Sequence, residues 1–312
     1  MKIIRKLHSF SDYDCPIVLA AGFFDGVHRG HCAILDYAAT VARRMKGEAW
    51  VLTFDVHPLK ILNPDVAPLM ITSTRHKLSL MKERGLTGAL LLPFSRELAE
   101  MPPKNFASEL FQNIPTLSEI VTGENWRFGA GGKGTPRLLQ EVATPSQVKI
   151  SALSPVLNGN LPISSTRIRT AIQQGNLEQA TAMLGRPPSV LGTVIHGHAI
   201  GRTLGFPSAN IDPHNEALPP LGVYAVRARV RNKVYDGVLN FGTRPTFQRE
   251  KGQRVPPVLE LHLINFNGCL YDEDIEAEFI AHIRDEWYFS STEELIAQIK
   301  KDVQQASTIL QN

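Results

Sequence analysis

Two histidines, His28 and His31, lie in a segment with three glycines, Gly22–His31. The preceding run Ile17–Ala21 is wholly apolar and bounded by turn residues, which predicts a buried strand. Residues 32–42 follow the apolar spacing of a helix. A strand-to-helix turn of this kind presents N–H groups to a phosphate, and the two imidazoles can donate hydrogen bonds to it. The pattern is short, so a pair of surface histidines beside a tight turn is the alternative.

An acid and a third histidine follow the next apolar run, residues 49–54. Asp55 and His57 would therefore stand at the carboxyl end of a second strand, on the same edge as the first histidine pair. A strand-ending turn closed by Pro58 explains the same residues without any chemistry.

A glycine-rich loop with basic residues follows the apolar run 119–122. Asn125 and Arg127 precede the stretch Gly129–Gly134, which contains Lys133. Such a loop can close over phosphates, although a mobile surface loop has the same composition.

Three hydroxyl residues and two arginines begin a predicted helix at Ile163–Arg169. Backbone amides, hydroxyl groups and guanidinium groups together suit a polyphosphate. The alternative is a serine-capped helix with solvated arginines.

The segment 196–210 combines several glycines with polar residues. Glycine lets the backbone approach a phosphate closely, and Ser208 and Asn210 offer the neutral oxygen ligands that Mg²⁺ accepts. His196 and His198 could form a metal pair, but no third ligand stands at a suitable spacing.

The elements that must position these groups divide into two kinds. The first half alternates apolar runs with helical segments, which predicts a parallel sheet with helices on both faces. Its expected strands are 17–21, 49–54, 88–92, 119–122 and 148–151, and its helices lie near 31–46, 74–84, 104–113 and 136–142. Ligands bind at the carboxyl ends of such strands, so the four clusters of the first half should converge there.

Two further helices, 164–174 and 177–184, lead to a stop at Gly185 and Pro187. Short β-rich runs at 190–195, 222–230, 233–239 and 259–266 follow, with a closing helix at 292–306. We therefore expect an α/β protein with a Rossmann-like domain over 1–186 and a small antiparallel barrel or sandwich with a C-terminal helix over 187–312.

Composition limits the class of protein. The chain has 312 residues, 43% hydrophobic and 20% charged, as in ordinary soluble proteins, and its net charge of +3 is too small to indicate a nucleic-acid partner. Cys15, Cys32 and Cys269 have no C-x-x-C spacing, which argues against a disulfide framework or zinc site and fits a reducing cytoplasm. Neither a secretory signal nor an apolar stretch of about 18 residues is found, so we expect no membrane partner.

In order along the chain, the motifs of the first half resemble the nucleotidyltransferase superfamily. They resemble more narrowly the bacterial bifunctional riboflavin kinase/FMN adenylyltransferases, also called FAD synthetases. The family patterns G-x-F-D-G-V-H-x-G-H, F-D-x-H-P, G-E-[DN]-x-R-F-G and I-S-S-T-R-I-R match Gly22–His31, Phe54–Pro58, Gly123–Gly129 and Ile163–Arg169. The G-x-x-x-G-R-x-L-G-F-P-T-A-N segment of riboflavin kinases is similar to 197–210, and further matches lie at 222–226, 240–247, 259–263 and 283–286.

For the first half, this resemblance implies direct attack of the FMN phosphate on the α-phosphorus of ATP, with release of pyrophosphate. His28 and His31 would stabilise charge on the phosphate oxygens, and Arg167 would hold the departing phosphates. The other residues implied for ATP are Gly22, Phe24, Asp25, Gly26, Ser164, Ser165, Thr166 and Arg169. Those implied for FMN are Asp55, His57, Asn125 and Arg127.

For the second half, the resemblance implies phosphorylation of riboflavin by ATP. Glu260, which alone would read as a surface carboxylate paired to a base, becomes the group that takes the proton from the ribityl 5′-hydroxyl. Ser208 and Asn210 would hold Mg²⁺. The residues implied for ATP are Gly197, Gly201, Arg202, Gly205, Phe206 and Pro207.

Three positions depart from the family pattern. Phe23 stands where the family often has Asn, and Val56 where it usually has Pro. Neither change removes a charged group, so we expect them to affect fine geometry rather than activity. Ser208 replaces a Thr, which keeps the hydroxyl but loses the methyl that restricts χ1. We expect Mg²⁺–nucleotide binding to be weakened or equal.

Two other functions fit parts of the pattern. One is an enzyme of the same superfamily that joins a different phosphate or nucleotide, with a degenerate barrel. It is disfavoured because the barrel retains Glu260, Asn210 and the glycine-rich turn together. The other is an RNA-binding module, for which clustered aromatics and a basic groove are missing. We expect riboflavin, FMN and ATP as small-molecule substrates, FAD as product, and a monomer or weak homo-oligomer.

Overall fold

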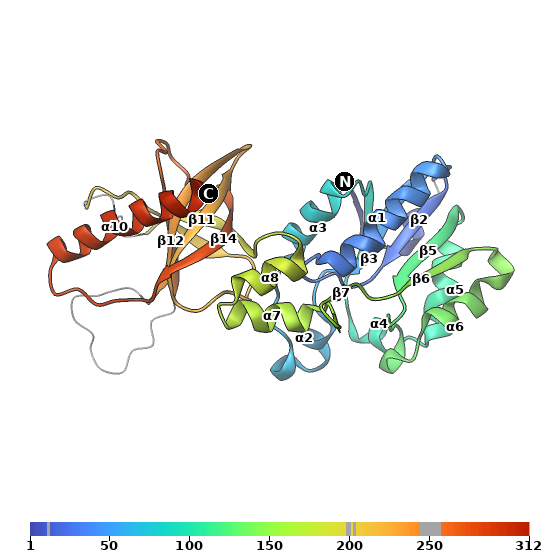
Figure 1. Ribbon diagram of the computed structural model, residues 1–312. Helices are drawn as coiled ribbons and strands as arrows, with labels where there is room; N and C mark the ends of the chain where they lie inside the picture. The colour runs from blue at the N-terminus through green and yellow to red at the C-terminus, as the bar shows by residue number, and fades with distance from the viewer. Residues whose placement is uncertain (11–12, 198–200, 202–203, 244–256, 312) are drawn as a thin grey trace. The chain divides into compact units, whose positions relative to one another are not determined.

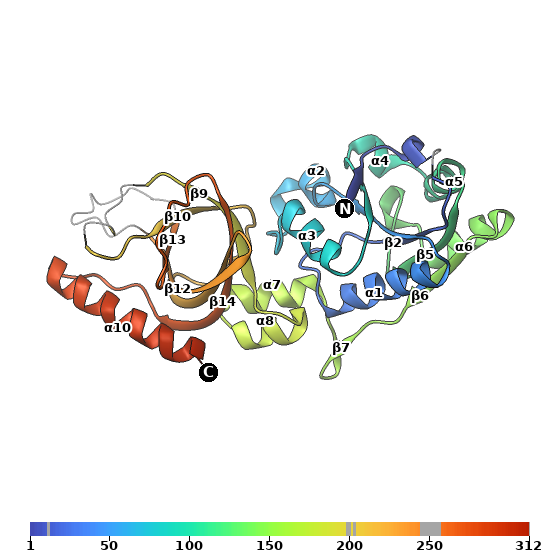
Figure 2. The same ribbon diagram turned by 90° about the horizontal axis from the view of Figure 1, so that it is seen from above.

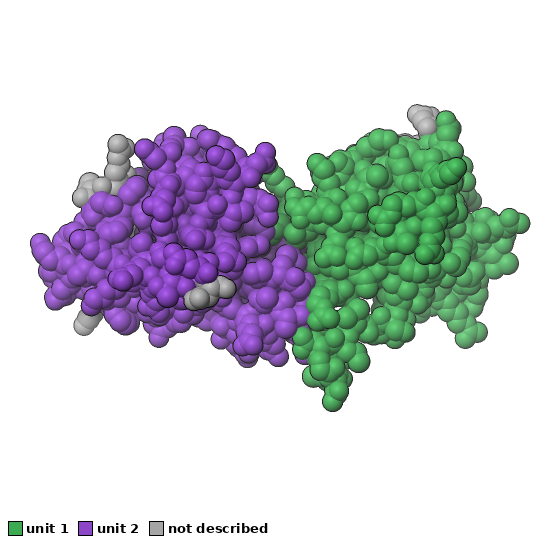
Figure 3. Space-filling model, turned by 45° about the horizontal axis from the view of Figure 1, so that its top comes forward, with its two compact units in different colours: residues 1–69, 74–165 green, residues 70–73, 166–312 purple. Residues whose placement is uncertain are grey.

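The computed structural model describes residues 1–10, 13–197, 201, 204–243 and 257–311. Contacts divide the chain into two compact units (Figure 3). Unit 1 comprises residues 1–69 and 74–165, and unit 2 comprises residues 70–73 and 166–312. The contacts therefore group most of the two helices before Pro187 with the second unit, and the boundary at 186/187 stays a prediction.

Unit 1 contains a six-stranded sheet in the order β1-β4-β3-β2-β5-β6 (Figure 1). Every neighbouring pair in it is parallel. The strands are β1 Lys2–Ile4, β2 Ile17–Ala21, β3 Glu48–Phe54, β4 Gly88–Leu92, β5 Leu117–Gly123 and β6 Lys149–Leu153. The predicted parallel sheet is confirmed, and β1 is an additional edge strand.

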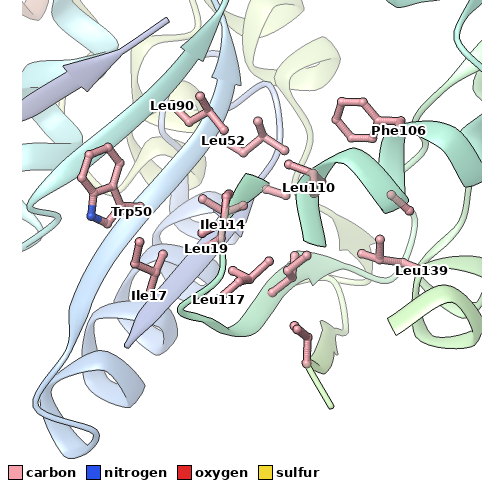
Figure 4. Close-up of a cluster of buried hydrophobic side chains, with 14 of the residues drawn as sticks. Ile17, Leu19, Trp50, Leu52, Leu90, Phe106, Leu110, Ile114, Leu117 and Leu139 are labelled. Carbon is pink, nitrogen blue, oxygen red and sulfur yellow. The ribbon is translucent and has the colours of Figure 1, made fainter. Parts of the chain in front are cut away.

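Helices cover both faces of this sheet because β2 and β3 bury side chains on both sides. One core joins Ile17 and Leu19 of β2 to Trp50 of β3 and Leu110 of α5 (Figure 4). The other core joins the opposite face to α1 and α3. The helices are α1 Arg29–Arg44, α2 Pro58–Leu62, α3 Thr74–Glu83, α4 Arg96–Glu100, α5 Pro103–Asn113 and α6 Pro136–Ala143. Four 3₁₀ turns (7–10, 64–66, 130–132, 144–146) and the hairpin β7 Leu157–Asn158 with β8 Leu161–Pro162 complete the unit.

The first strand of the core, β2, lies between β3 and β5. The chain therefore reverses its direction of strand addition at β2, which makes its carboxyl end the switch point where ligands bind in such sheets. The loops that follow β2, β3 and β5 leave the sheet at this one edge.

Unit 2 contains a closed barrel in the order β10-β13-β12-β11-β14-β9, with all pairs antiparallel (Figure 2). Of the two predicted architectures, the structure has the barrel. Its strands are β9 Ser189–Ile195, β10 Ala209–Pro213, β11 Gly222–Val230, β12 Lys233–Gly242, β13 Val258–Leu263 and β14 Asp274–Arg284.

Helices accompany the barrel. The helix α7 (Ser165–Gln173) and the helix α8 (Leu177–Leu184) precede it. The predicted closing helix is α10, Thr292–Gln311, which lies against β11 and β12 (Figure 1). Its residues Ala306 and Leu310 pack in one cluster with Val223 of β11 and Val238 of β12. No helix in the described part of the chain is both long and apolar enough to cross a membrane.

Candidate active sites

The turn after β2 has an unusual backbone. Phe24 (φ 60°), Gly26 (φ 81°) and Val27 (φ 40°) all lie in the left-handed region, which is an outlier for the β-branched Val27. The ring of Phe24 lies 2.9 Å from where a Cβ on Gly22 would stand, so a larger residue there would displace it. Backbone conformations of this kind are energetically unfavourable and persist only where the surrounding structure holds them, often at functional sites.

The two histidines form a stacked pair at the end of this turn. Their ring centroids are 3.5 Å apart at an angle of 18°. His28 caps α1, and its Nδ1 accepts the N–H of His31 (3.3 Å), so a neutral His28 carries its proton on Nε2. Burial, then the charges of His28 and Lys77, lower the pKa of His31 well below its usual value. The pair therefore presents imidazole donors while His31 stays neutral near pH 7.

Ser165, the first residue of α7, is hydrogen-bonded to this turn. The Ser165 hydroxyl donates to the carbonyl oxygen of Asp25 (3.0 Å), and Asp25 is itself buried. Ser164 directly precedes this contact, while Thr166, Arg167 and Arg169 occupy the first turns of the helix. The structure thus brings Ser165 to the histidine turn, as the sequence predicts.

The residues after β3 have partners that fix the loop. Asp55 Oδ1 accepts the N–H of Phe94 (3.0 Å), and the Asp55 carbonyl accepts the Thr74 hydroxyl (2.6 Å). His57 caps α2 through Nδ1, and its ring meets that of Phe23 edge-on at 4.8 Å. Both residues lie at the predicted edge of the sheet, and the side chain of each accepts a hydrogen bond from a backbone N–H group.

The loop after β5 is an ordered turn. Asn125 and Arg127 are exposed, and the Arg127 guanidinium donates to the carbonyl of Trp126 (2.9 Å). Phe128 and Gly134 exchange two backbone hydrogen bonds (3.2 and 2.8 Å), which closes the glycine-rich stretch between them. Hydrogen bonds therefore hold both ends of the glycine-rich stretch, and Lys133 within it is exposed.

A buried lysine that the sequence analysis does not identify lies under this site. Lys77 of α3 is 1% exposed. Its ammonium group donates to the carbonyls of Phe23 (3.0 Å) and Phe54 (3.2 Å) and to the Thr53 hydroxyl (3.2 Å). A lysine on an amphipathic helix is normally exposed, and nothing in the sequence indicates that this one is buried. Its position becomes visible only in the folded structure.

The barrel places three polar residues in one row. Asn210 of β10 pairs with Glu260 of β13, which pairs in turn with Asn240 of β12. Residues paired in this way project from the same side of a sheet. Their neighbours Ile211, Leu259 and other apolar residues fill the barrel core, so the three polar groups face outward and are half-buried. Asn240 is a neighbour of Glu260 that the sequence analysis does not assign.

The glycine-rich segment approaches this row closely. A Cβ on Gly197 would collide with the Asn210 amide, and one on Gly201 would lie 2.8 Å from the Ser208 hydroxyl. The Nδ1–H of His262, two residues after Glu260, donates to the carbonyl of Pro207 (2.8 Å) and so anchors the turn to β13.

The remaining predicted residues of this segment lie around the same turn. Phe206 meets the ring of His262 edge-on at 5.6 Å, and its N–H donates to the carbonyl of Gly201 (2.8 Å). Gly205 has a φ of 85°, a conformation that favours glycine. Arg202 lies outside the described residues.

Of the alternative metal pair, only His196 lies among the described residues. His196 stacks on Tyr271 at 4.0 Å, and His198 lies outside the described residues. Across the ranges that the structure describes, no cluster of three His, Cys, Asp or Glu residues could hold a metal ion.

Comparison with known proteins gives two family matches. Residues 11–167 match the model of FAD synthetase, and residues 184–310 match that of riboflavin kinase. The chain is 36% identical to the bifunctional riboflavin kinase/FMN adenylyltransferase of Escherichia coli over 97% of this chain and 96% of that protein. It is 34% identical to the protein of the same name from Bacillus subtilis, over 99% and 98%.

A solved structure has the same fold. It is described as a macrolide-efflux protein from Streptococcus pneumoniae and superposes with a TM-score of 0.81 at 28% identity, covering 98% of each chain.

Proposed function

The chain belongs to the family of bifunctional riboflavin kinase/FMN adenylyltransferases, and from this premise we propose that it makes FAD from riboflavin in two steps. The second unit phosphorylates riboflavin to FMN, and the first joins FMN to the adenylyl group of ATP. The observation that carries this assignment is that each matched segment contains one of the two sites built above. The histidine turn lies within 11–167, and the Glu260 row lies within 184–310.

In adenylyl transfer, the FMN phosphate attacks the α-phosphorus of ATP and pyrophosphate leaves. A phosphate nucleophile is already ionised, so the step needs no general base. His28 and His31 donate to the oxygens on which charge builds, and Arg167 with Ser164, Ser165 and Thr166 binds the departing phosphates. The low pKa of His31 supports this role, because a neutral imidazole can donate its N–H in a hydrogen bond without first taking up a proton from solvent.

Two further groups of residues bind the substrates of this reaction. The turn residues Gly22, Phe24, Asp25 and Gly26, with Arg169, receive the ATP phosphates. Asp55, His57, Asn125 and Arg127 receive FMN, which their place on the loops after β3 and β5 supports.

In the second unit the attacking group is a neutral alcohol, so a base is useful. Glu260 takes the proton of the ribityl 5′-hydroxyl as its oxygen bonds to the γ-phosphorus of ATP and ADP leaves. Asn210 and Asn240 flank the carboxylate on both sides and can orient it. ATP binds to Gly197, Gly201, Arg202, Gly205, Phe206 and Pro207, of which Arg202 lies outside the described residues.

Ser208 and Asn210 fit a magnesium ion. Each offers a neutral oxygen, and each lies against a glycine that leaves room where a Cβ would otherwise stand. When bound, Mg²⁺ neutralises phosphate charge during transfer. The hydroxyl of Ser208 and the amide oxygen of Asn210 would hold it together with the phosphates of ATP.

We place the enzyme in the cytoplasm as a monomer or weak homo-oligomer that binds small molecules and neither membrane nor nucleic acid. The spacing of the three cysteines, without a C-x-x-C pair, supports this placement.

A time course of flavin products tests the proposed function. The purified chain is incubated with riboflavin, ATP and Mg²⁺, and the flavins are separated by chromatography. We expect FMN to rise first and then give way to FAD. If FMN accumulates and no FAD forms, the function proposed for the first unit is contradicted. If riboflavin gives no product while supplied FMN is converted to FAD, the function proposed for the second unit is contradicted.

A further inference from the structure

The ammonium group of Lys77 joins two loops of the adenylyltransferase site. The carbonyl of Phe23 belongs to the turn that leads to His28, and the carbonyl of Phe54 directly precedes Asp55. A lysine has three donors, and these two carbonyls and the Thr53 hydroxyl use all three. One buried cation therefore cross-links the carboxyl ends of β2 and β3 to α3.

A side chain that this family's pattern does not lead one to expect completes the arrangement. Phe23 replaces the Asn that is frequent there, and its ring lies 4.2 Å from the Lys77 nitrogen on one side and meets His57 on another. A cation over an aromatic face is attracted by the ring, most strongly where water is excluded. The Thr53 hydroxyl also donates to the Phe23 carbonyl (3.0 Å), so backbone and ring of this one residue are both held.

Titratable groups on three neighbouring segments interact with Lys77. Asp25 on the turn after β2 and Asp55 on the loop after β3 attract its positive charge, while the charge of Lys77 acts on His31 of α1. Burial outweighs both carboxylates and lowers the pKa of Lys77 to about 8. The charge that holds the loops is therefore lost at only mildly alkaline pH.

We propose that Lys77 is a positioning residue for adenylyl transfer: it holds the turn of His28 and the loop of Asp55 and His57 in the geometry that the reaction requires. The inference rests on the proposed adenylyltransferase function of unit 1. Displacement of reacting groups by about 1 Å can cost a rate factor of about 10², which sets the size of the effect.

The test compares variants of the full chain in both reactions. Lys77→Met removes the ammonium group, Lys77→Arg keeps a charge that does not titrate, and Lys82→Met removes an exposed lysine from the same helix as the matched control. For each, kcat and KM are measured for FMN to FAD and for riboflavin to FMN, and adenylylation is followed from pH 6.5 to 9.5.

We expect Lys77→Met to lower kcat/KM of adenylylation by about 10²-fold, mostly through kcat, with the kinase reaction unchanged. Wild type should lose adenylylation as pH rises through about 8. Lys77→Arg should keep activity within about tenfold of wild type and lack this alkaline decline, because a guanidinium stays protonated. A merely structural lysine would not move the pH profile.

Adenylylation in Lys77→Met within threefold of Lys82→Met would overturn the proposal, as would an unchanged alkaline decline in Lys77→Arg. If Lys77→Met does not fold, the pH profile of Lys77→Arg decides alone. A wild-type chain unable to make FAD would instead overturn the adenylyltransferase function, and the positioning role with it.

Discussion

The first site depends on an asymmetry between two neighbouring imidazoles. His28 and His31 stack at 3.5 Å, a distance at which two positive charges would repel strongly. Burial and the nearby Lys77 lower the pKa of His31, so one ring of the pair stays neutral. The Nδ1 of His31 is buried and has no hydrogen-bond partner among the described residues. A pair of this kind can donate hydrogen bonds to phosphate oxygens as negative charge builds on them, without itself accumulating charge.

This asymmetry predicts acid sensitivity of unit 1. The unfolded chain protonates His31 below its usual pKa of about 6.5, while the folded chain keeps it neutral. Stability from this group is therefore full above pH 6.5 and is lost as pH falls below it, by at most about 1.4 kcal/mol for each pH unit. Urea unfolding at pH 5, 6 and 7 should give a shallower loss for His31→Gln than for wild type. Equal slopes would contradict the low pKa.

Single residues mark the limit of what sequence can predict. The histidine turn was predictable because glycines, histidines and a strand-to-helix change occur together within ten residues. Lys77 and His262 were not, because a lysine on a helix and a histidine on a strand are usually solvated. Their hydrogen bonds to distant carbonyls arise only from the fold. Asn240 likewise gains meaning only from its register with Glu260.

At the scale of elements, apolar runs predicted the buried strands well. The expected strand 17–21 has the observed bounds of β2, and 88–92 those of β4. The expectations do not include β1, β10 or β14. The three residues of β1 are mostly exposed, and β14 alternates Glu276 and Glu278 with buried Ala277 and Phe279, so neither contains the continuous apolar run on which the expected strands rest. The sequence placed Asn210 in a ligand-binding loop, whereas in the structure it belongs to the strand β10.

One buried ion pair ties the last helix to the barrel. Arg284 of β14 donates to both oxygens of Asp302 on α10 (2.9 to 3.1 Å), and their side chains are only 11% and 3% exposed. Removal of one partner from a buried pair leaves an uncompensated charge, which costs about 3 kcal/mol or more. We expect Asp302→Asn to lower the free energy of unfolding of unit 2 by this amount, measured by urea titration with kinase activity and circular dichroism as readouts.

The control is an exposed ion pair on the same barrel. Arg227 and Asp236 lie 4.0 Å apart with side chains 43% and 42% exposed. Asp236→Asn should change the free energy of unfolding by less than about 1 kcal/mol, because water screens such pairs. Similar effects of the two substitutions would mean that the buried pair contributes no special stability.

At the scale of the whole molecule, the chain consists of two units with different architectures and different chemistry. We propose that the first supplies imidazoles and hydroxyl groups for an ionised nucleophile, and that the second supplies a carboxylate for a neutral one. Each unit has its own core and its own family match. Apart from Thr166, Arg167 and Arg169, which begin α7 and belong to the second unit, the roles proposed for each reaction fall on residues of a single unit.

The most direct test of this central claim compares His28→Ala and Glu260→Gln in both reactions. We expect His28→Ala to slow FAD formation by about 10²- to 10³-fold and to leave riboflavin phosphorylation unchanged. Glu260→Gln should slow FMN formation by about 10²- to 10⁴-fold and still make FAD from supplied FMN at the wild-type rate. An unchanged rate in the reaction assigned to either residue, or the loss of both reactions in both folded variants, would contradict the assignment of one reaction to each unit.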